Sequence, residues 1–308
     1  MPAPPINSQT RLVGLIGWPV EHSMSPAMHN AAFEALDLNW RYVPLPVRPQ
    51  HIDTAVGGLA AVGGLAALGF RGANVTVPHK EAVFHALDRS EHPDAVAAEA
   101  RALGAVNTLV VHQGAVDAPI ITGHNTDAAG FVGSLEAAGA RLEAISAVVV
   151  GAGGAARAVV FGLIQAGARA VTVLNRNEKR AEQLVADLGD ADPAPAHLRA
   201  APLEAGRLIE TSRTADLLVN ATPVGMWPRE EGSIWPHGVP VPSHLTVFDL
   251  VYNPPTTEFL RQARVSGARA IDGLDMLVRQ GARAFELWTG QDAPIAVMRR
   301  ACRRSLRT

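Results

Sequence analysis

The chain has 308 residues, which suggests about two domains and allows sizeable cores without disulfide or metal staples. Its 27 Lys and Arg residues balance 29 Asp and Glu residues to a net charge of −2, so charge gives no case for binding nucleic acid or an anionic membrane surface. The 48% hydrophobic content argues against intrinsic disorder, and a single cysteine, Cys302, excludes an intrachain disulfide and fits a reducing compartment.

The N-terminal residues lack the basic and then apolar pattern of a signal peptide. The longest run of small and apolar residues, 55–70, carries five glycines and is too short to predict a membrane span. We therefore expect a soluble, cytoplasmic protein.

Short strand-like runs alternate with helical stretches, which is typical of an α/β fold with parallel strands. The repeated AVGGLA at 55–66 predicts only a weak or frayed helix, because each interior glycine costs roughly 1 kcal/mol relative to alanine. The strands expected in the first half are 12–17, 40–46, 72–77, and a pair at 105–111 and 119–122 around a turn at Gln113 and Gly114.

Three further helices are expected in the first half. The first begins at Ser25, with Ser25 as N-cap and Pro26 in the first helical position, and runs to about residue 36. The second begins at Pro78 and places Lys80 in its first turn, and the third covers 127–138.

The second half begins with a βαβ unit, followed by strands separated by loops and helices. Its elements are a strand at 147–150, the turn GAGGAARA, a helix to about residue 166, strands at 170–174, 217–220, 246–250 and 269–271, a long loop at 223–242 and a helical tail from Leu274.

The turn between the first strand and helix of this βαβ unit carries Gly151, Gly153 and Gly154, with Ala156 in place of a third glycine. This context matches the dinucleotide-binding fingerprint, in which glycine lets the backbone approach a pyrophosphate and the helix N-terminus stabilises the anion. The alternative is a tight strand–helix turn that binds nothing.

The end of the second strand of this unit indicates which dinucleotide would bind. An Asp or Glu there would bind a ribose diol, but the chain has Asn175-Arg176-Asn177-Glu178-Lys179-Arg180. Guanidinium and ammonium groups suit a 2′-phosphate, so NADP is favoured over NAD, although Glu178 keeps NAD open. A solvated basic helix start is the alternative, which the helix dipole disfavours.

A third group of polar residues lies at strand ends and helix starts, the edge where open α/β sheets bind ligands. Lys80 is one of only two lysines, and arginine cannot replace lysine in proton transfer at neutral pH. Each member also has a structural alternative: a helix cap, a turn, a strand or a surface residue. The group comprises Ser23, Ser25, Thr76, Lys80, Asn107 and Asp127, and it suits a small polyhydroxylated ligand.

Nine motifs, in order along nearly the whole chain, resemble the shikimate dehydrogenase family. The matching stretches are IGWPVEHSMSPAMHN, GANVTVPHKEAV, GAVNTLV, HNTDAAGF, VVVGAGGAARAVV, NRNEKRAEQL, NATPVGM, FDLVYNPPTTEFL and DGLDMLVRQGARAF.

The resemblance implies a two-domain α/β fold. A discontinuous substrate-binding catalytic domain takes residues 1–126, with 273–308 returning to it, and a Rossmann-type NADP-binding domain takes 127–272. The implied activity is NADPH-dependent reduction of 3-dehydroshikimate to shikimate, a step of aromatic amino-acid biosynthesis. The implied partner is this small-molecule substrate, with no nucleic acid, membrane or metal, and a homodimer stays open.

The resemblance also assigns roles to residues. Lys80 and Asp127 match the catalytic pair, in which Lys80 gives a proton to the alkoxide formed by hydride transfer and Asp127 aligns it with the reacting hydroxyl. The substrate ligands it implies are Ser23, Ser25 and Tyr252 at the carboxylate, and Thr76, Asn107, Asp127 and Gln280 at the ring hydroxyls. The cofactor contacts it implies are Gly151, Ala152, Gly153, Gly154, Ala155, Asn175, Arg176, Asn177, Lys179, Arg180, Leu250 and Gly273.

Three positions depart from the family pattern. Ala128 and Asp275 stand where glycine is usual, and Asn177 stands where threonine is usual. Asp275 lies two residues from Gly273, so an extra carboxylate there could alter the preference for cofactor or substrate.

Two other functions stay open. One is a relative that oxidises quinate as well as shikimate, often with NAD; Arg176 and the two serines argue against it. The other is a non-catalytic sensor of dinucleotide or shikimate, which would be expected to lose Lys80 and Asp127.

Overall fold

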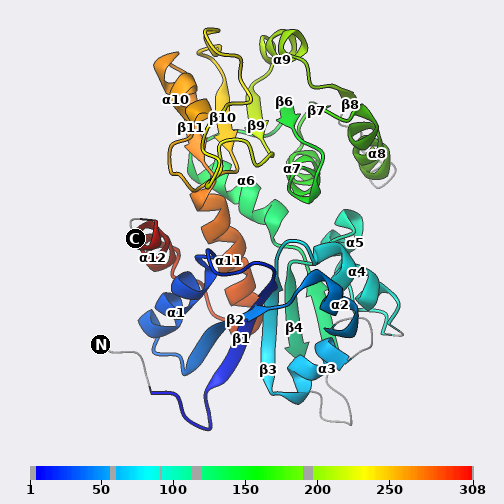
Figure 1. Ribbon diagram of the computed structural model, residues 1–308, viewed down its shortest axis with the longest axis vertical. Coiled ribbons are helices and arrows are strands. Elements are labelled where there is room, and N and C mark those ends of the chain that lie inside the picture. Colours follow the sequence, from blue (N-terminus) through cyan, green and yellow to red (C-terminus); the bar gives the residue numbers. More distant parts are fainter. Residues whose placement is uncertain (1–4, 56–59, 91, 113–119, 190–196, 307–308) are drawn as a thin grey trace. The chain divides into compact units, whose positions relative to one another are not determined.

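The computed structural model describes residues 5–55, 60–90, 92–112, 120–189 and 197–306 (Figure 1). Contacts divide the chain into two compact units. The first unit is Met1–Thr126 with Gln280–Thr308, and the second unit is Asp127–Arg279. The chain therefore returns to the first unit inside helix α11 (Leu274–Thr289), whereas the sequence placed this return at residue 273.

The first unit contains a five-stranded mixed sheet in the order β2-β1-β3-β4-β5. β1, β2 and β3 are parallel, β4 is antiparallel to β3, and β5 is antiparallel to β4. The ends of β1, β3 and β5 therefore lie at the same edge as the start of β4, and we call this the ligand edge. The strands are β1 (Arg11–Gly17), β2 (Trp40–Pro46), β3 (Phe70–Val75), β4 (Thr108–His112) and β5 (Ile120–His124).

Helices cover both faces of this sheet (Figure 1). On one face Leu65 and Phe84 pack with Ala73 and Leu109 of the strands. On the other face Phe33 stacks on Phe285, with ring centroids 5.2 Å apart. The helices of the first face are α2 (Pro49–Ala55), α3 (Ala60–Ala67), α4 (Lys80–Asp88) and α5 (Ala98–Leu103); those of the second are α1 (Ser25–Ala35), α12 (Ile295–Ser305) and the end of α11.

Several predicted boundaries in this unit were wrong. Ser25 is the first residue of α1 and not its cap, because Met24 holds the cap position. β3 ends at Val75, and α4 begins at Lys80 after His79 as cap. β4 begins at Thr108 rather than at residue 105, because the N–H of Val106 donates to the carbonyl of Lys80 (3.0 Å).

Two expectations concern residues that the structure does not describe. The turn at Gln113 and Gly114 lies outside the described residues, as do residues 56–59 of the AVGGLA repeat. Of the rest of that repeat, Ala55 ends α2 and residues 60–66 belong to α3, so this part is helical, as the sequence predicted.

The second unit contains a six-stranded parallel sheet in the order β8-β7-β6-β9-β10-β11. The strand order changes direction between β6 and β9, which is the switch point where open parallel sheets bind ligands. The strands are β6 (Ser146–Val150), β7 (Ala170–Asn175), β8 (His197–Pro202), β9 (Leu217–Asn220), β10 (Thr246–Asp249) and β11 (Arg269–Asp272).

Two apolar clusters lie on the two faces of this sheet. In one, Phe131 and Val159 pack with Val149, and in the other, Leu208 and Phe259 pack with Val148. Because alternate residues of β6 feed opposite clusters, this strand is buried on both sides. The helices of the first cluster are α6 (Asp127–Ala137), α7 (Gly154–Gln165) and α8 (Glu178–Gly189); those of the second are α9 (Ala205–Ser212) and α10 (Glu258–Val265).

β8 is the strand that sequence reasoning missed; the helices α5, α9 and α10 were not predicted either. The sequence of β8 is HLRAAP, of which the first four residues alternate between exposed and half-buried, and it joins the sheet at its edge beside β7. An edge strand of this composition carries little hydrophobic pattern, so only pairing with β7 defines it.

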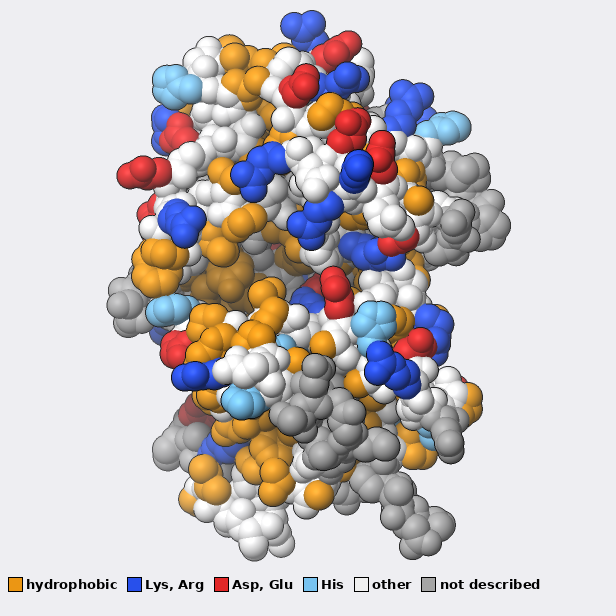
Figure 2. Space-filling model, turned by 45° about the vertical axis from the view of Figure 1, so that its right-hand side comes forward, with side chains coloured by type: hydrophobic (Ala, Val, Ile, Leu, Met, Phe, Trp, Pro, Cys, Tyr) orange, Lys and Arg blue, Asp and Glu red, His pale blue; other side chains and the backbone are white. Residues whose placement is uncertain are grey.

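The surface carries charges of both signs. On the face shown in Figure 2, Lys and Arg side chains are interspersed with Asp and Glu side chains. Among the described residues, no helix is long and apolar enough to cross a membrane.

Candidate functional site

The ligand edge of the first unit brings together most of the polar residues that the sequence singled out there. Ser23 and Ser25 follow β1, Thr76 and Lys80 follow β3, and Asn107 immediately precedes β4. Asp127 follows β5 directly after Thr126 and is the first residue of α6. These groups are far apart in the sequence, and they lie at one edge because of the order and direction of the strands that they flank.

Ser23 and Ser25 form a small turn at the start of α1. The N–H of Ser25 donates to Oγ of Ser23 (3.2 Å), so the Ser23 hydroxyl takes up a helix N–H that would otherwise lack a partner. Ser25 is only 7% exposed, and its hydroxyl is hydrogen-bonded to the hydroxyl of Tyr42. Two hydroxyls at a helix N-terminus can bind a carboxylate without any arginine.

Thr76 and Lys80 are held in place by backbone contacts, Thr76 with β1 and Lys80 with the segment that precedes β4. The N–H of Thr76 donates to Ile16 O (2.8 Å), and a Cβ at Gly17 would overlap the Thr76 methyl group. The carbonyl of Lys80 accepts from Val106, and its side chain is half-buried. An ammonium at a helix N-terminus works against the helix dipole, so helix stability does not explain a lysine here.

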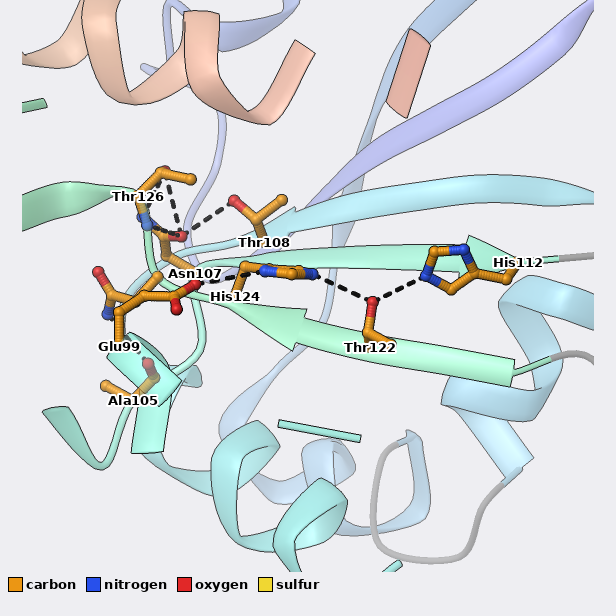
Figure 3. A network of polar contacts seen from close by, with 9 residues as sticks. Glu99, Ala105, Asn107, Thr108, His112, Thr122, His124 and Thr126 are labelled. Atoms are coloured by element: carbon orange, nitrogen blue, oxygen red, sulfur yellow. Dashed lines mark hydrogen bonds and ion pairs between the residues drawn. The ribbon is translucent and has the colours of Figure 1, made fainter. Parts of the chain in front are cut away.

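Asn107 lies at the centre of a polar network (Figure 3). Its Oδ1 accepts from the N–H of Thr126 (2.9 Å) and from Oγ1 of Thr108 (2.9 Å), and its Nδ2 donates to Oγ1 of Thr126 (3.0 Å). The Thr126 hydroxyl also reaches Oε1 of Gln280 (3.5 Å). Asn107 is 2% exposed, so these bonds fix its amide in one orientation.

A histidine pair, His112 on β4 and His124 on β5, extends this network (Figure 3). Oγ1 of Thr122 lies 3.0 Å from Nε2 of His112 and 3.1 Å from Nε2 of His124, and Nδ1 of His124 lies 3.3 Å from the Glu99 carboxylate. These contacts fasten α5 to β5 next to the backbone bond from Asn107 N to His124 O.

The glycine turn of the second unit joins β6 to α7 beside the switch point. Gly151 has a φ of +116°, and a Cβ there would lie 2.9 Å from Ala221 O, so only glycine fits. Gly153 and Gly154 are exposed, and a Cβ at either would meet no atom within 4 Å. Gly153 caps α7 without a side-chain hydrogen bond, and Ala152 and Ala155 flank this open space.

This turn fits a dinucleotide pyrophosphate. The backbone is open at Gly153 and Gly154, and the first N–H groups of α7 have no side-chain cap. These N–H groups and the positive end of the helix dipole are suited to binding an anion.

The residues after β7 form an exposed basic segment. Asn175 Nδ2 donates to Asn177 O (2.9 Å), and the N–H of Arg180 donates to the same carbonyl (3.1 Å), which fixes the turn into α8. Arg176, Lys179 and Arg180 are exposed around this turn, next to β6 in the sheet. Such a cluster suits a phosphate on a ribose 2′ position.

Leu250 and Gly273 approach each other after β10 and β11. A Cβ at Gly273 would overlap the carbonyl of Leu250, so the side chain must be absent for the backbones to meet. Tyr252, half-buried, follows two residues after Leu250.

A buried network that the sequence did not single out holds this region. Asp249, 0% exposed, accepts from Nδ2 of Asn220 (2.9 Å), from the N–H of Val251 (3.0 Å) and from Oγ1 of Thr257 (2.6 Å). Burial raises the pKa of Asp249 to about 6, and the charge of Asp272 on β11 adds to the rise, whereas the three hydrogen bonds oppose it. Asn220 and Asp249 stand in the quoted motifs NATPVGM and FDLVYNPPTTEFL, but no sequence pattern distinguishes buried polar groups from exposed ones.

The two glycine replacements have local explanations. Asp275 forms an i,i+4 ion pair with Arg279, Oδ2 to Nε 2.7 Å, so its carboxylate is balanced by a charge on the same helix. Ala128 is buried, and its carbonyl lies 3.3 Å from where a Cβ at Gly162 would be, so α6 and α7 pack closely there. Asn177 contributes only its carbonyl to the turn after β7.

Among the residues that the structure describes, no group of three or more His, Cys, Asp or Glu side chains could hold a metal ion. Cys302 is buried in α12, which raises the pKa of its thiol to about 11.

Comparison with known proteins identifies the family. Residues 15–109 match the Shikimate dehydrogenase substrate binding domain, residues 135–222 match Shikimate / quinate 5-dehydrogenase, and residues 273–303 match the Shikimate 5′-dehydrogenase C-terminal domain. A shikimate dehydrogenase (NADP(+)) of Moorella thermoacetica is 47% identical over 302 residues, which cover 98% of this chain and 95% of the relative. The chain belongs to the shikimate dehydrogenase family.

Solved structures of shikimate dehydrogenases have the same fold. One in complex with NADP+ matches with a TM-score of 0.86 and 35% identity over 99% of both chains. The shikimate dehydrogenase of Thermus thermophilus, in complex with NADP(H) and shikimate, matches with a TM-score of 0.80 and 39% identity over 96% of this chain and 99% of that one. The α/β fold class predicted from the sequence, with its Rossmann-type part, is confirmed.

The raised pKa of Asp249 predicts how the stability of the second unit depends on pH. Between the unfolded value of 3.8 and the folded value of about 6, the folded chain keeps a proton that the unfolded chain has lost. The contribution of Asp249 to the free energy of unfolding therefore falls as pH rises through this range, by about 3 kcal/mol in all. We expect Asp249→Asn to abolish this part of the pH dependence, as measured by urea unfolding at a series of pH values.

A second variant tests the cause. Asp272→Asn removes the neighbouring charge and should shift the fall to lower pH without abolishing it. Equal pH profiles for wild type and Asp249→Asn would contradict the assignment.

Proposed function

We propose that this protein catalyses the reversible, NADP-dependent interconversion of 3-dehydroshikimate and shikimate. The observation that carries the proposal is the ligand edge. It combines two hydroxyls at a helix start with an amide and an amine, and the carboxylate of Asp127 follows Thr126 in the chain. The chain matches an NADP(+)-dependent shikimate dehydrogenase over nearly its whole length.

The ligand edge supplies groups that suit the carboxylate and the ring hydroxyls of the substrate. Ser23 and Ser25, at the start of α1, would hold the carboxylate, with Tyr252 at the same end of the substrate. Thr76, Asn107 and Gln280 would bind the ring hydroxyls, and hydrogen bonds through Thr126 support two of these three.

The cofactor would bind to the second unit. Residues 151–155 would hold its pyrophosphate, and Asn175, Arg176, Asn177, Lys179 and Arg180 would bind its 2′-phosphate side. Leu250 and Gly273, which meet backbone to backbone, would contact the nicotinamide part. When bound, NADPH supplies the hydride that reduces the ring carbonyl.

Lys80 would transfer the proton of the reaction, and Asp127 would position it. The Lys80 ammonium stabilises negative charge on the carbonyl oxygen as it forms and donates the proton that completes the hydroxyl. Asp127, the first residue of α6, would hold the ammonium and the reacting hydroxyl in line. In the reverse direction the neutral Lys80 amine accepts the hydroxyl proton.

A second substrate remains a candidate because one matching family is described as Shikimate / quinate 5-dehydrogenase. Quinate differs in carrying a tertiary hydroxyl beside its carboxylate. The two close-set serines, with Ser25 bonded to buried Tyr42, favour the flatter carboxylate end of shikimate.

A reducing compartment suits this proposal. The single cysteine, Cys302, leaves no intrachain disulfide, which fits a reducing compartment, and we place the protein in the cytoplasm. Cell fractionation with an antibody to the protein tests this placement.

The direct test is an absorbance assay of reduced nicotinamide with shikimate or quinate, each paired with NADP+ or NAD+. We expect turnover to be fastest with shikimate and NADP+. Preference for quinate with NAD+ would favour the second candidate, and no turnover with any pair would contradict a dehydrogenase.

Lys80 variants test the proton-transfer role. We expect Lys80→Ala to lower kcat by about 10²- to 10⁴-fold, the usual contribution of a general acid, with little change in KM for shikimate. Lys80→Arg keeps the positive charge but cannot transfer the proton, so it should be as impaired. A Lys80→Arg enzyme with substantial kcat would show that charge alone is required.

Arg176 variants test the choice of cofactor. Arg176→Asp should raise KM for NADP+ by roughly 10- to 100-fold, because charge-assisted hydrogen bonds to the 2′-phosphate are lost, and should change KM for NAD+ much less. Arg207→Asp makes the same charge change on the exposed first turn of α9 and should leave both KM values unaltered. Equal effects on the two cofactors would contradict a 2′-phosphate site at Arg176.

A further inference from the structure

The side-chain amide of Asn220, at the end of β9, is hydrogen-bonded entirely inside the second unit. Its Nδ2 donates to Oδ1 of Asp249 (2.9 Å) and to the carbonyl of Val224 (3.3 Å). Its Oδ1 accepts from the N–H of Thr222 (3.0 Å) and from the Thr222 hydroxyl (2.6 Å). An amide has two N–H donors and two lone pairs on its oxygen, so these bonds use all of its hydrogen-bonding positions.

Asp249 determines which way this amide points. Asp249 and Asn220 are each 0% exposed, and the carboxylate also accepts from the N–H of Val251 (3.0 Å) and from Oγ1 of Thr257 (2.6 Å). An ionised carboxylate can only accept hydrogen bonds. The amide nitrogen of Asn220 must therefore face Asp249, and the amide oxygen must face Thr222.

This orientation shapes the turn formed by residues 221–224, which we call the β9 turn. Asn220 bonds to both Thr222 and Val224, and the Thr222 hydroxyl accepts from the N–H of Val224 (3.3 Å). A Cβ at Gly151 would lie 2.9 Å from Ala221 O and 3.1 Å from Cγ2 of Thr222. The β9 turn therefore lies against the glycine turn that suits a pyrophosphate.

The order of the strands places the β9 turn away from the segment proposed for the 2′-phosphate. Arg176 follows β7, whereas the β9 turn and Leu250 follow β9 and β10, in a sheet ordered β7-β6-β9-β10. With about 4.8 Å between neighbouring strands, β9 and β10 lie roughly 10 and 14 Å from β7. The N–H of Leu250 donates to Asn220 O (3.0 Å), and Leu250 meets Gly273, so Asn220 belongs to the side proposed for the nicotinamide.

We propose that Asn220, oriented by Asp249, is a positioning residue for the nicotinamide half of the cofactor. It holds the β9 turn in one conformation beside Gly151 and so shapes the place where the nicotinamide and its ribose would lie, without touching them. The inference rests on the proposed function, because it needs NADP to bind along this edge of the sheet. It adds a buried residue that acts on the cofactor only through the turn that it holds.

The test compares two ligands that share the adenosine half of the cofactor. NADP+ has both halves, whereas adenosine 2′,5′-bisphosphate has the 2′-phosphate but no nicotinamide. For Asn220→Ala we expect the dissociation constant of NADP+ to rise about tenfold, the order of one hydrogen bond, because the β9 turn loses its fixed conformation. The dissociation constant of adenosine 2′,5′-bisphosphate should stay at its wild-type value. Both are measured by isothermal titration calorimetry.

Variants of Thr222 keep the proposal testable if Asn220→Ala does not fold. Thr222→Val keeps the shape but removes the hydroxyl that joins Asn220 to the N–H of Val224, so it should weaken NADP+ binding in the same selective way. Thr222→Ser keeps the hydroxyl and should retain both wild-type dissociation constants.

Thr257→Val is the control for a loss of stability alone. Thr257 donates to Oδ2 of Asp249 and caps α10 by accepting from the N–H of Leu260 (3.2 Å), whereas Asn220 donates to Oδ1. The variant should therefore unfold at a lower urea concentration than the wild type and leave both dissociation constants unchanged, because the bonds of Asn220 remain.

The outcomes separate the inference from the function on which it rests. A wild-type protein that neither binds NADP+ nor turns over shikimate overturns the proposed function. A wild type that binds NADP+, with unchanged constants in Asn220→Ala and Thr222→Val, overturns the inference. Equal weakening of NADP+ and adenosine 2′,5′-bisphosphate also overturns it, as does a Thr257→Val protein that loses as much NADP+ affinity as Asn220→Ala, because either pattern shows only structural damage.

Discussion

The antiparallel insertion of β4 between β3 and β5 is the constraint on which the first unit depends. Because β4 runs against both neighbours, its start meets their ends at one edge. Asn107 lies at that meeting point, where both ends of its amide bond to Thr126. An asparagine suits this position because one side chain offers both a donor and an acceptor. The edge can therefore collect residues from distant parts of the chain in a fixed arrangement.

In the second unit, a sheet of parallel strands alone brings candidate binding residues to one edge. The order of its sheet reverses at β6 and β9, and Gly151 lets the turn after β6 pass close to Ala221 after β9. Asp249 then ties the ends of β9 and β10 together from inside through Asn220 and Thr257. In each unit a buried polar network lies next to candidate binding residues: that of Asn107 in the first unit and that of Asp249 in the second. Hydrogen bonds at the ends of strands hold both networks together.

Two helices carry positively charged side chains in their first turn, where the helix dipole favours negative charge. Lys80 begins α4, and Lys179 and Arg180 lie in the first turn of α8, where the helix dipole disfavours cations by a few tenths of a kcal/mol to about 1 kcal/mol each. A stable fold gains nothing from this placement. The proposed ligands explain it, because a nascent alkoxide at Lys80 and a phosphate beside α8 are both anionic.

The sequence alone determined much of this protein. The apolar runs placed β2 and β9 at their observed bounds, and the turn chemistry of Gly151 to Gly154 placed the start of α7, because local patterns and glycine conformations leave few alternatives. Motif order along the chain was sufficient to indicate the family.

Only the tertiary structure decided the rest. It shows that β4 begins at Thr108 and that β8 is a strand of the sheet. It also shows that Tyr42, Asn74 and Asp249, which look like ordinary strand residues in the sequence, form buried hydrogen bonds. Whether a polar side chain is buried, and which partner it meets there, depends on the pairing of strands that are far apart in the chain. No local pattern carries that information, whereas the pairing of β3 with β4 and of β9 with β10 fixes it directly.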